Sequence, residues 1–282
     1  MVAPILSAFA DEYAKSLTEQ LEGLNRFGIQ YLELRQADGK NVANMSQSEV
    51  IEAERRLSDH GIKVSAIGSP LGKIALDGDM HAHMEQTKRV CETATRLGAR
   101  YVRVFSFYLP VGRTREDCKA EVVDALGNML DIAKSFGVIM CHENEAKIWG
   151  ESPEECRELL DQLGGRLRAV FDMGNFVLGG YEPIGAYELL REYIEYFHIK
   201  DALARGAIVP AGMGEARIGE ILADFKSRAE NDFFISLEPH LETFAGLKTL
   251  TSEAFENPYK YADQKTAFAD AVAKINQVLE GI

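Results

Sequence analysis

The sequence has 282 residues, of which 46% are hydrophobic, so it is long and apolar enough for one large α/β domain or two ordinary domains with a substantial core. Its formal net charge is −13. This charge excludes a protein that works by neutralising a phosphate backbone, because such binding needs clustered Lys and Arg. We therefore expect a small-molecule substrate or a protein partner, and no nucleic acid.

The sequence also argues against a membrane protein. No apolar stretch approaches the roughly 18 residues that cross a bilayer. The first residues, "MVAPILSAFADEYAKS", have neither a basic region nor a long apolar segment of the secretory kind. The four cysteines form no Cys-x-x-Cys pair, and we expect them to be reduced. These features predict a cytoplasmic protein without a membrane partner.

Short runs of β-branched and aromatic residues recur along the chain, and each is predicted to form a strand. The runs cover residues 3–9, 30–35, 63–69, 100–107, 137–143, 168–173, 195–201 and 232–238. Segments with apolar residues three or four apart separate the runs and are predicted to be helices. The clearest are 16–28, 48–61, 83–98 and 118–137, each ending at a Gly suited to a left-handed cap, and 263–282.

Strand and helix alternate eight times, which is typical of an α/β protein built as a closed (β/α)8 TIM barrel. An open, doubly wound sheet is the alternative. No stretch rich in Pro, Gly or Ser divides the chain. We therefore expect one barrel domain spanning residues 1–282.

Strand parity selects a set of polar residues at one end of this barrel, because successive side chains point to opposite faces. Phe197 and Ile199 share the outward parity of their strand, whereas His198 lies on the inward parity. The same count places three carboxylates on the inward parity at the ends of neighbouring strands: Glu143, Asp172 and Glu238. In TIM barrels, this end of the strands carries the active site.

Three carboxylates at one barrel mouth repel each other unless positive charge lies between them. Together with His198 they predict a site for a divalent metal, held by Glu143, Asp172, His198 and Glu238. The oxygen-rich ligand set favours Mn²⁺, with Mg²⁺, Co²⁺ and Zn²⁺ as alternatives.

Several motifs carry a family resemblance. They are "HEN" at 142–144, "FDMGNF" at 171–176, "HIKDA" at 198–202, "VPAGMGEARIGEIL" at 209–222 and "SLEPHL" at 236–241. The chain resembles the xylose isomerase-like TIM-barrel superfamily, specifically its sugar (phosphate) isomerase and epimerase branch, which includes the D-tagatose 3-epimerases. The resemblance implies a single divalent metal on the four residues above, and a sugar as the small-molecule substrate. A homo-oligomer is also compatible with the resemblance.

The resemblance further implies that Glu143 and Glu238 are the catalytic acid and base, one on each face of the sugar. One carboxylate removes a proton next to a ketose carbonyl, the metal stabilises the enediolate, and the other carboxylate returns the proton. Some epimerases carry a second His three residues after the metal-binding Asp. This chain has Asn175 there, so substrate contacts at that point are expected to differ.

Other residues near the predicted mouth are candidate substrate contacts, each with a structural alternative. Glu33 and Arg35 share the inward parity of the second strand and either contact substrate or pair with each other. Lys200 and Arg103 either bind substrate or balance the carboxylates. The remaining candidates are Trp149, His240 and, for a phosphorylated substrate, Lys73 after the Gly-rich "GSPLGK" at 68–73.

Two other functions remain open at this stage. The same metal site suits a lyase that dehydrates a keto-inositol or keto-sugar, and a sugar-binding protein without catalysis is the second alternative. Zinc-dependent abasic-site nucleases of the superfamily need more histidines than the six present here.

Overall fold

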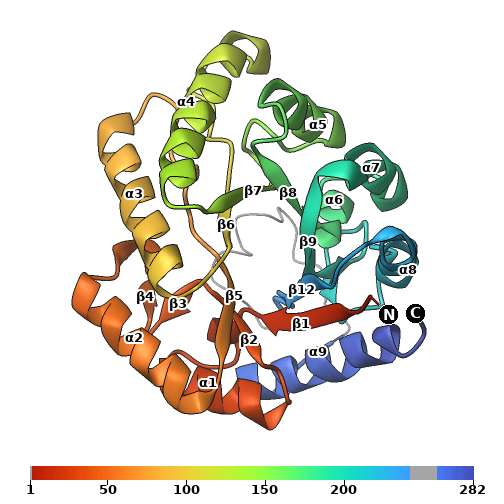
Figure 1. Ribbon diagram of the computed structural model, residues 1–282. Helices are drawn as coiled ribbons and strands as arrows, with labels where there is room; N and C mark the ends of the chain where they lie inside the picture. Colours follow the sequence, from red (N-terminus) through yellow and green to blue (C-terminus); the bar gives the residue numbers. More distant parts are fainter. Residues whose placement is uncertain (1, 242–258) are drawn as a thin grey trace.

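The computed structural model describes residues 2–241 and 259–282. Eight parallel strands form a closed barrel in the order β1-β12-β9-β8-β7-β6-β5-β2, so the predicted TIM barrel is confirmed (Figure 1). The barrel strands are β1 (Pro4–Ala8), β2 (Tyr31–Leu34), β5 (Lys63–Ile67), β6 (Tyr101–Val104), β7 (Ile139–Glu143), β8 (Arg168–Asp172), β9 (Ile194–Ile199) and β12 (Phe233–Leu237).

Helices surround the barrel on its outside (Figure 1). They are α1 (Leu17–Arg26), α2 (Gln47–His60), α3 (Met80–Arg96), α4 (Arg115–Ser135), α5 (Pro153–Gln162), α6 (Met173–Leu178), α7 (Pro183–Leu190), α8 (Ile218–Arg228) and α9 (Gln264–Leu279). Short 3-10 turns lie at η1 (Ala10–Glu12), η2 (Val42–Asn44) and η3 (Arg191–Tyr193). Two small hairpins, β3 (Gln36–Ala37) with β4 (Lys40–Asn41) and β10 (Asp201–Ala202) with β11 (Ile208–Val209), follow strands β2 and β9.

Each predicted strand matches a barrel strand, although some observed strands are shorter. The run 100–107, for example, is a strand only over Tyr101–Val104. The residues after it pair instead with the loop that follows β5, through hydrogen bonds such as Phe105 N–H to the Leu71 carbonyl at 2.7 Å. The glycines predicted to end helices all have positive φ, namely Gly28, Gly61, Gly98 and Gly137.

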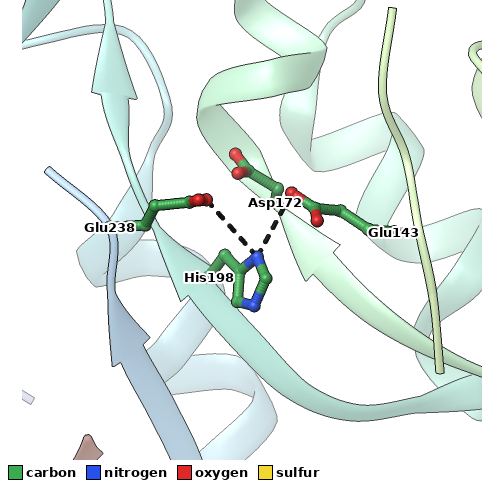
Figure 2. Close-up of side chains that lie close together, drawn as sticks. All are labelled: Glu143, Asp172, His198 and Glu238. Carbon is green, nitrogen blue, oxygen red and sulfur yellow. Dashed lines mark ion pairs between the residues drawn. The ribbon is translucent and has the colours of Figure 1, made fainter. Parts of the chain in front are cut away.

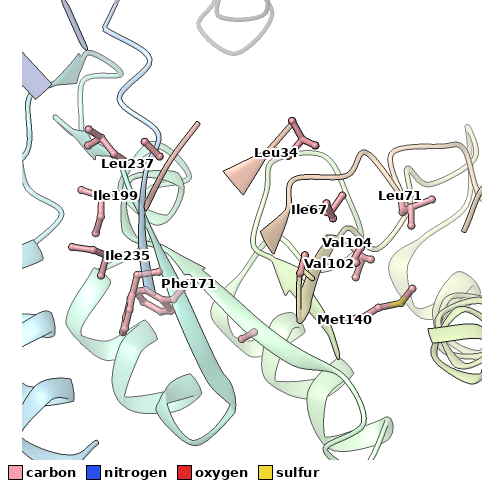
Figure 3. Close-up of a cluster of buried hydrophobic side chains, with 14 of the residues drawn as sticks. Leu34, Ile67, Leu71, Val102, Val104, Met140, Phe171, Ile199, Ile235 and Leu237 are labelled. Atoms are coloured by element: carbon pink, nitrogen blue, oxygen red, sulfur yellow. The ribbon is translucent and has the colours of Figure 1, made fainter. Parts of the chain in front are cut away.

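The core has two layers, as strand parity predicts. The inside of the barrel contains a small cluster formed by Ala66, Tyr101, Cys141, Val170 and Tyr196. The larger layer lies between the strands and the helices, and Figure 3 shows part of it, including Val102, Phe171, Ile199, Ile235 and Leu237. Because apolar residues on the outward parity secure the strands to the helices, the inward parity is available for polar groups at the barrel mouth.

Two findings bear on the sequence-based expectations about redox state and membranes. All four cysteines, Cys91, Cys118, Cys141 and Cys156, are buried and unpaired. Among the described residues, no helix combines the length and apolar character required to cross a bilayer.

Phe197 is a central residue of the outer layer. Its ring is fully buried and makes edge contacts with the rings of Phe171, Phe225 and Phe233. We predict that Phe197→Ala lowers the free energy of unfolding by about 3–5 kcal/mol, because it removes an aromatic ring and leaves a cavity. Ile51→Ala, at a position 46% exposed, is the control and should change stability by less than about 0.5 kcal/mol. Urea unfolding of both variants measures the difference, and equal losses would contradict this account.

His142 predicts a pH dependence of stability. It lies on β7 with the outward parity, and its Nε2 is 3.0 Å from Ser106 Oγ. Burial lowers the pKa of His142 to about 4. Below about pH 6.5 the imidazole is therefore protonated in the unfolded chain while it stays neutral in the folded one.

Protonation of His142 in the unfolded chain therefore costs no stability above about pH 6.5 and lowers the stability as the pH falls from about 6.5 towards 4, by up to about 1.4 kcal/mol per pH unit. In His142→Gln that contribution disappears. Urea unfolding at several pH values should therefore give a shallower acid slope for His142→Gln than for the wild type. Parallel slopes would show that His142 does not carry this pH dependence.

Candidate metal centre

Four polar side chains meet at the carboxyl-terminal mouth of the barrel (Figure 2). Glu143 and Asp172 are the last residues of β7 and β8, His198 belongs to β9, and Glu238 directly follows β12. All four are buried, and one potential ligand atom from each lies within 4.8 Å of the others. The structure therefore brings together the four residues selected by strand parity, in an arrangement that could hold a metal ion.

The two glutamates are oriented in the same way. Glu143 Oε1 lies 3.2 Å from His198 Nδ1, whereas Glu143 Oε2 lies 3.1 Å from Arg103 Nη1. Glu238 Oε2 lies 3.5 Å from His198 Nδ1, and Glu238 Oε1 accepts a hydrogen bond of 2.8 Å from Arg35 Nη1. Each glutamate thus presents one oxygen to the centre of the group and the other oxygen to an arginine.

Glu33 lies beneath this centre and is completely buried. Its carboxylate accepts a hydrogen bond of 3.0 Å from Tyr196 Oη and lies 3.3 Å from His198 Nε2. A proton on Nε2 is therefore directed at Glu33, which leaves Nδ1 as the nitrogen that faces the group. Of the two expectations for Glu33, pairing with Arg35 is wrong within the described residues, since Glu33 orients the imidazole instead.

Lys200 and Asn175 form hydrogen bonds with the three converging carboxylates. Lys200 Nζ donates hydrogen bonds to Asp172 Oδ2 at 2.8 Å, Glu238 Oε2 at 3.1 Å and Asn175 Oδ1 at 3.1 Å. Asn175 Nδ2 donates to Glu143 Oε1 at 3.3 Å. Charge balance, one of the two expectations for Lys200, matches these contacts.

Two residues that sequence reasoning left without a role shape the site. Asn144 exchanges a pair of hydrogen bonds with the backbone of Asp172, at 2.8 and 3.0 Å, and so fixes the end of β8 against β7. Asp201 accepts hydrogen bonds from backbone amides of the loop at 212–216, at 2.8–3.0 Å. A Cβ on Gly214 would lie 2.2 Å from Asp201 Oδ1. The conjunction of "HIKDA" and "PAGMG" is therefore explained by a carboxylate that holds a glycine loop.

The mouth contains a second set of charged groups around Arg35. Its guanidinium is bonded to Asp11 and Glu12, which follow β1, as well as to Glu238. His240 Nδ1 lies 2.8 Å from Glu12 Oε1. Sequence reasoning missed Asp11 and Glu12, although the signal was present as two acids directly after the first predicted strand.

The pKa of His198 shows that the buried carboxylates around it favour positive charge. Burial alone lowers the pKa of His198, but the carboxylates of Glu33 and Glu143 outweigh it and raise the pKa to about 10. Burial raises the pKa of Asp172 to about 6 even though Lys200 opposes the shift. In the absence of a bound cation His198 therefore keeps its proton near neutral pH, whereas the pKa of Glu143 is lowered to about 2, because His198 and Arg103 outweigh the effect of burial.

Two of the loop candidates, Trp149 and Lys73, are engaged in contacts within the chain. The ring of Trp149 is only 2% exposed, and its Nε1 donates to the Arg115 carbonyl at 2.9 Å, so little of its surface remains to cover a substrate. The amides of 68–73 do not form a phosphate cradle, because those of Gly68, Ser69, Leu71, Gly72 and Lys73 are all bonded within the chain. Lys73 itself pairs with Glu145 at 2.9 Å.

A cavity of about 310 Å³ adjoins the group. Asn144 and Asn175, which contact the metal-ligand candidates, form part of its wall. The rest of the lining mixes polar and apolar side chains, including Glu145, Lys147, Leu178 and Ile208. The four converging residues are not among its lining residues, so a polar molecule of a few carbon atoms in this cavity would meet Asn144 and Asn175 first.

Comparison with solved structures identifies proteins of similar fold. An L-ribulose 3-epimerase superposes with a TM-score of 0.74 at 19% identity, over 100% of this chain and 95% of its own. The D-psicose 3-epimerase of Clostridium cellulolyticum H10, solved with D-tagatose, gives 0.72 at 15% identity over 97% of each chain. The IOLI protein, solved with a zinc atom, gives 0.74 at 20% identity over 98% of each chain.

Two sequence comparisons give different results. No protein of curated function matches the chain. The model of the xylose isomerase-like TIM barrel family, in contrast, matches residues 21–262, which include the barrel strands from β2 to β12 and all four converging residues. This chain therefore belongs to the xylose isomerase-like TIM barrel family.

Proposed function

We propose that the protein is a divalent-metal-dependent isomerase or epimerase that acts on a ketose or related keto-sugar by moving a proton next to its carbonyl. The observation that carries the proposal is the pair of glutamates described above, each with one oxygen directed to a common centre. Two opposed carboxylates are what proton removal and return on opposite faces of a carbon require.

The donor set fits a divalent cation. Three carboxylates and one imidazole nitrogen converge, and His198 Nδ1 faces Glu143 and Glu238 at 3.2 and 3.5 Å without a hydrogen bond of good geometry among the described residues. Such a nitrogen costs free energy unless something satisfies it, and a metal ion does so. We assign Glu143, Asp172, His198 and Glu238 as the ligands, with Mn²⁺ favoured over Mg²⁺, Co²⁺ and Zn²⁺ by the oxygen-rich set. When bound, the cation polarises the substrate carbonyl and stabilises the negative charge that develops on oxygen.

The side chains then have distinct tasks. Glu143 and Glu238 exchange the proton, and Glu33 keeps His198 in the required orientation and tautomer. Lys200, Arg103 and Asn175 surround the place where the sugar oxygens would lie, with His240 at the rim. The adjoining cavity is proposed to hold the part of the sugar that does not react.

The remaining expectations are proposals of the same kind. The neighbouring structures include ketose 3-epimerases and a zinc-bound protein, which supports a sugar substrate and a divalent metal. We propose a single barrel domain for residues 1–282, a cytoplasmic location and assembly into a homo-oligomer. Dehydration of a keto-inositol is not favoured by any contact in the site.

The ligand assignment predicts a loss of metal binding in two variants. Asp172→Ala removes a ligand and should abolish the high-affinity binding of Mn²⁺. Glu33→Gln removes the acceptor for His198 Nε2–H and should weaken Mn²⁺ binding by about 10–100-fold. Titration of metal-free protein with Mn²⁺, followed by electron paramagnetic resonance of the free ion, measures both effects. Glu121→Gln, on the exposed side of α4, is the matched control, and a full metal complement in Asp172→Ala would refute the assignment.

Proton exchange tests the reaction itself. Metal-loaded protein incubated with a panel of ketoses in D₂O should incorporate deuterium at the carbon next to the carbonyl of its substrate. Glu143→Gln and Glu238→Gln should each slow this exchange by about 10²–10⁴-fold, because a carboxamide does not accept the proton. Nuclear magnetic resonance of the recovered sugar measures the incorporation.

The outcome also separates the alternatives. Deuterium in an epimer or isomer of the substrate supports the proposal. An unsaturated product with ultraviolet absorbance would establish the lyase instead, and tight binding of a ketose without exchange would indicate a binding protein.

A further inference from the structure

A second set of potential metal ligands lies next to the proposed metal centre and shares one residue with it. Glu12, Glu238 and His240 each offer an atom within 4.8 Å of the others. The carboxylate of Asp11 lies beside them, bonded to the same arginine. Glu238 thus belongs to both groups, as a carboxylate that bridges two metal ions would.

In this structure, the guanidinium of Arg35 bonds the two carboxylates of that second set, while His240 pairs with the same two carboxylates at 2.8 and 3.5 Å. Nε bonds Asp11 Oδ2 at 2.8 Å, Nη1 bonds Glu238 Oε1 at 2.8 Å and Nη2 bonds Glu12 Oε1 at 3.2 Å. The guanidinium carbon lies 4.6 Å from the centre of the Phe9 ring, which supports it from one side. All three nitrogens are therefore committed, each to a different carboxylate.

The charges explain why something positive has to be there. Asp11, Glu12 and Glu238 are all largely buried, with side-chain exposures of 7%, 11% and 4%. Buried carboxylates at this spacing repel each other strongly without a counter-charge. Either a planar guanidinium or a metal ion meets that need, and the two exclude each other from the same space.

The geometry points to a positioning role for Arg35: it takes the place of a second cation, keeps the centre mononuclear and reserves Glu238 Oε2 for the metal. This inference rests on the metal centre of the proposed function. With Oε1 held by Arg35, Glu238 presents Oε2 towards His198 Nδ1 and Lys200 Nζ, at 3.5 and 3.1 Å. Without Arg35, Oε1 would be available to a second ion shared with Glu12 and His240.

Arg103 provides a contrast within the same mouth. Its Nη1 lies 3.1 Å from Glu143 Oε2 and, more distantly, 3.8 Å from Glu238 Oε1, and its other nitrogens donate to the Gly68 and Ser69 carbonyls. Within the described part of the chain, the two ligand groups found are the four-residue centre and the Glu12 group, and Arg103 fills neither. Loss of Arg103 should therefore disturb Glu143 without creating a metal site.

The number of bound ions tests the inference without any substrate. We predict that metal-free wild type binds one equivalent of Mn²⁺ per chain. Arg35→Ala should bind two, and the two ions should show the magnetic coupling of Mn²⁺ pairs about 3.5–4 Å apart in electron paramagnetic resonance spectra. Arg35→Ala combined with Glu12→Gln should return to one equivalent, because the second set loses a ligand. Arg103→Ala should remain at one.

If Arg35→Ala does not fold, Arg35→Lys provides a second test of the inference. Lysine retains the charge but has a single nitrogen, so it cannot reproduce the planar fork in which three separate nitrogens each hold one carboxylate. It should bind one equivalent, with an affinity lower by about 10–100-fold because Glu238 is no longer held. Two equivalents in the wild type, one in folded Arg35→Ala, or wild-type affinity in Arg35→Lys would overturn the inference. None of these results depends on finding a sugar substrate, so the inference and the proposed reaction can fail independently.

Discussion

The constraint on which the site depends is the mutual repulsion of carboxylates buried at the barrel mouth. Glu143, Asp172 and Glu238 converge there, and Glu33 lies directly below them. Each of these groups is costly to bury unless it is compensated, so positive charge must be supplied close by. Arg35, Arg103 and Lys200 supply part of it, and the pKa of His198 is raised because the cluster still attracts a proton.

The apolar layer of the barrel offsets the cost of burying these charges. Side chains of the outward parity, such as Phe197 and Ile235, form the large apolar layer under the helices, and they stabilise the strands independently of the mouth. The inward parity adds only a small apolar cluster below the site. Outward side chains along each strand provide the packing. The inward side chains at the carboxyl-terminal ends are therefore available for the polar groups of the site.

The polar groups around the centre differ in how they hold it. Glu33 acts on His198 from beneath, Asn144 fixes the backbone of Asp172, and Arg35 and Arg103 orient the glutamates. In the proposed metal centre, such contacts would set which ligand atom faces the ion and therefore how well the ion is bound. They also leave Glu143 and Glu238 with one oxygen each directed to the centre, as the proposed acid and base pair requires.

The sequence by itself determined the periodicities, and through them the two faces of each strand and the four inward residues, because strand parity is a local property of the chain. It predicted the barrel with an open sheet as the alternative, and the pairing of distant strands decided that the barrel closes. For Lys200 it left two roles open, substrate binding and charge balance. The partners of those residues were decided only by the tertiary structure. Glu33 meets His198, and Arg35 meets Asp11 and Glu12, across strands and loops distant in sequence. Loop packing likewise buried Trp149 and occupied the amides of 68–73. Contacts of this kind depend on how separate loops fold over the mouth, which no local pattern encodes.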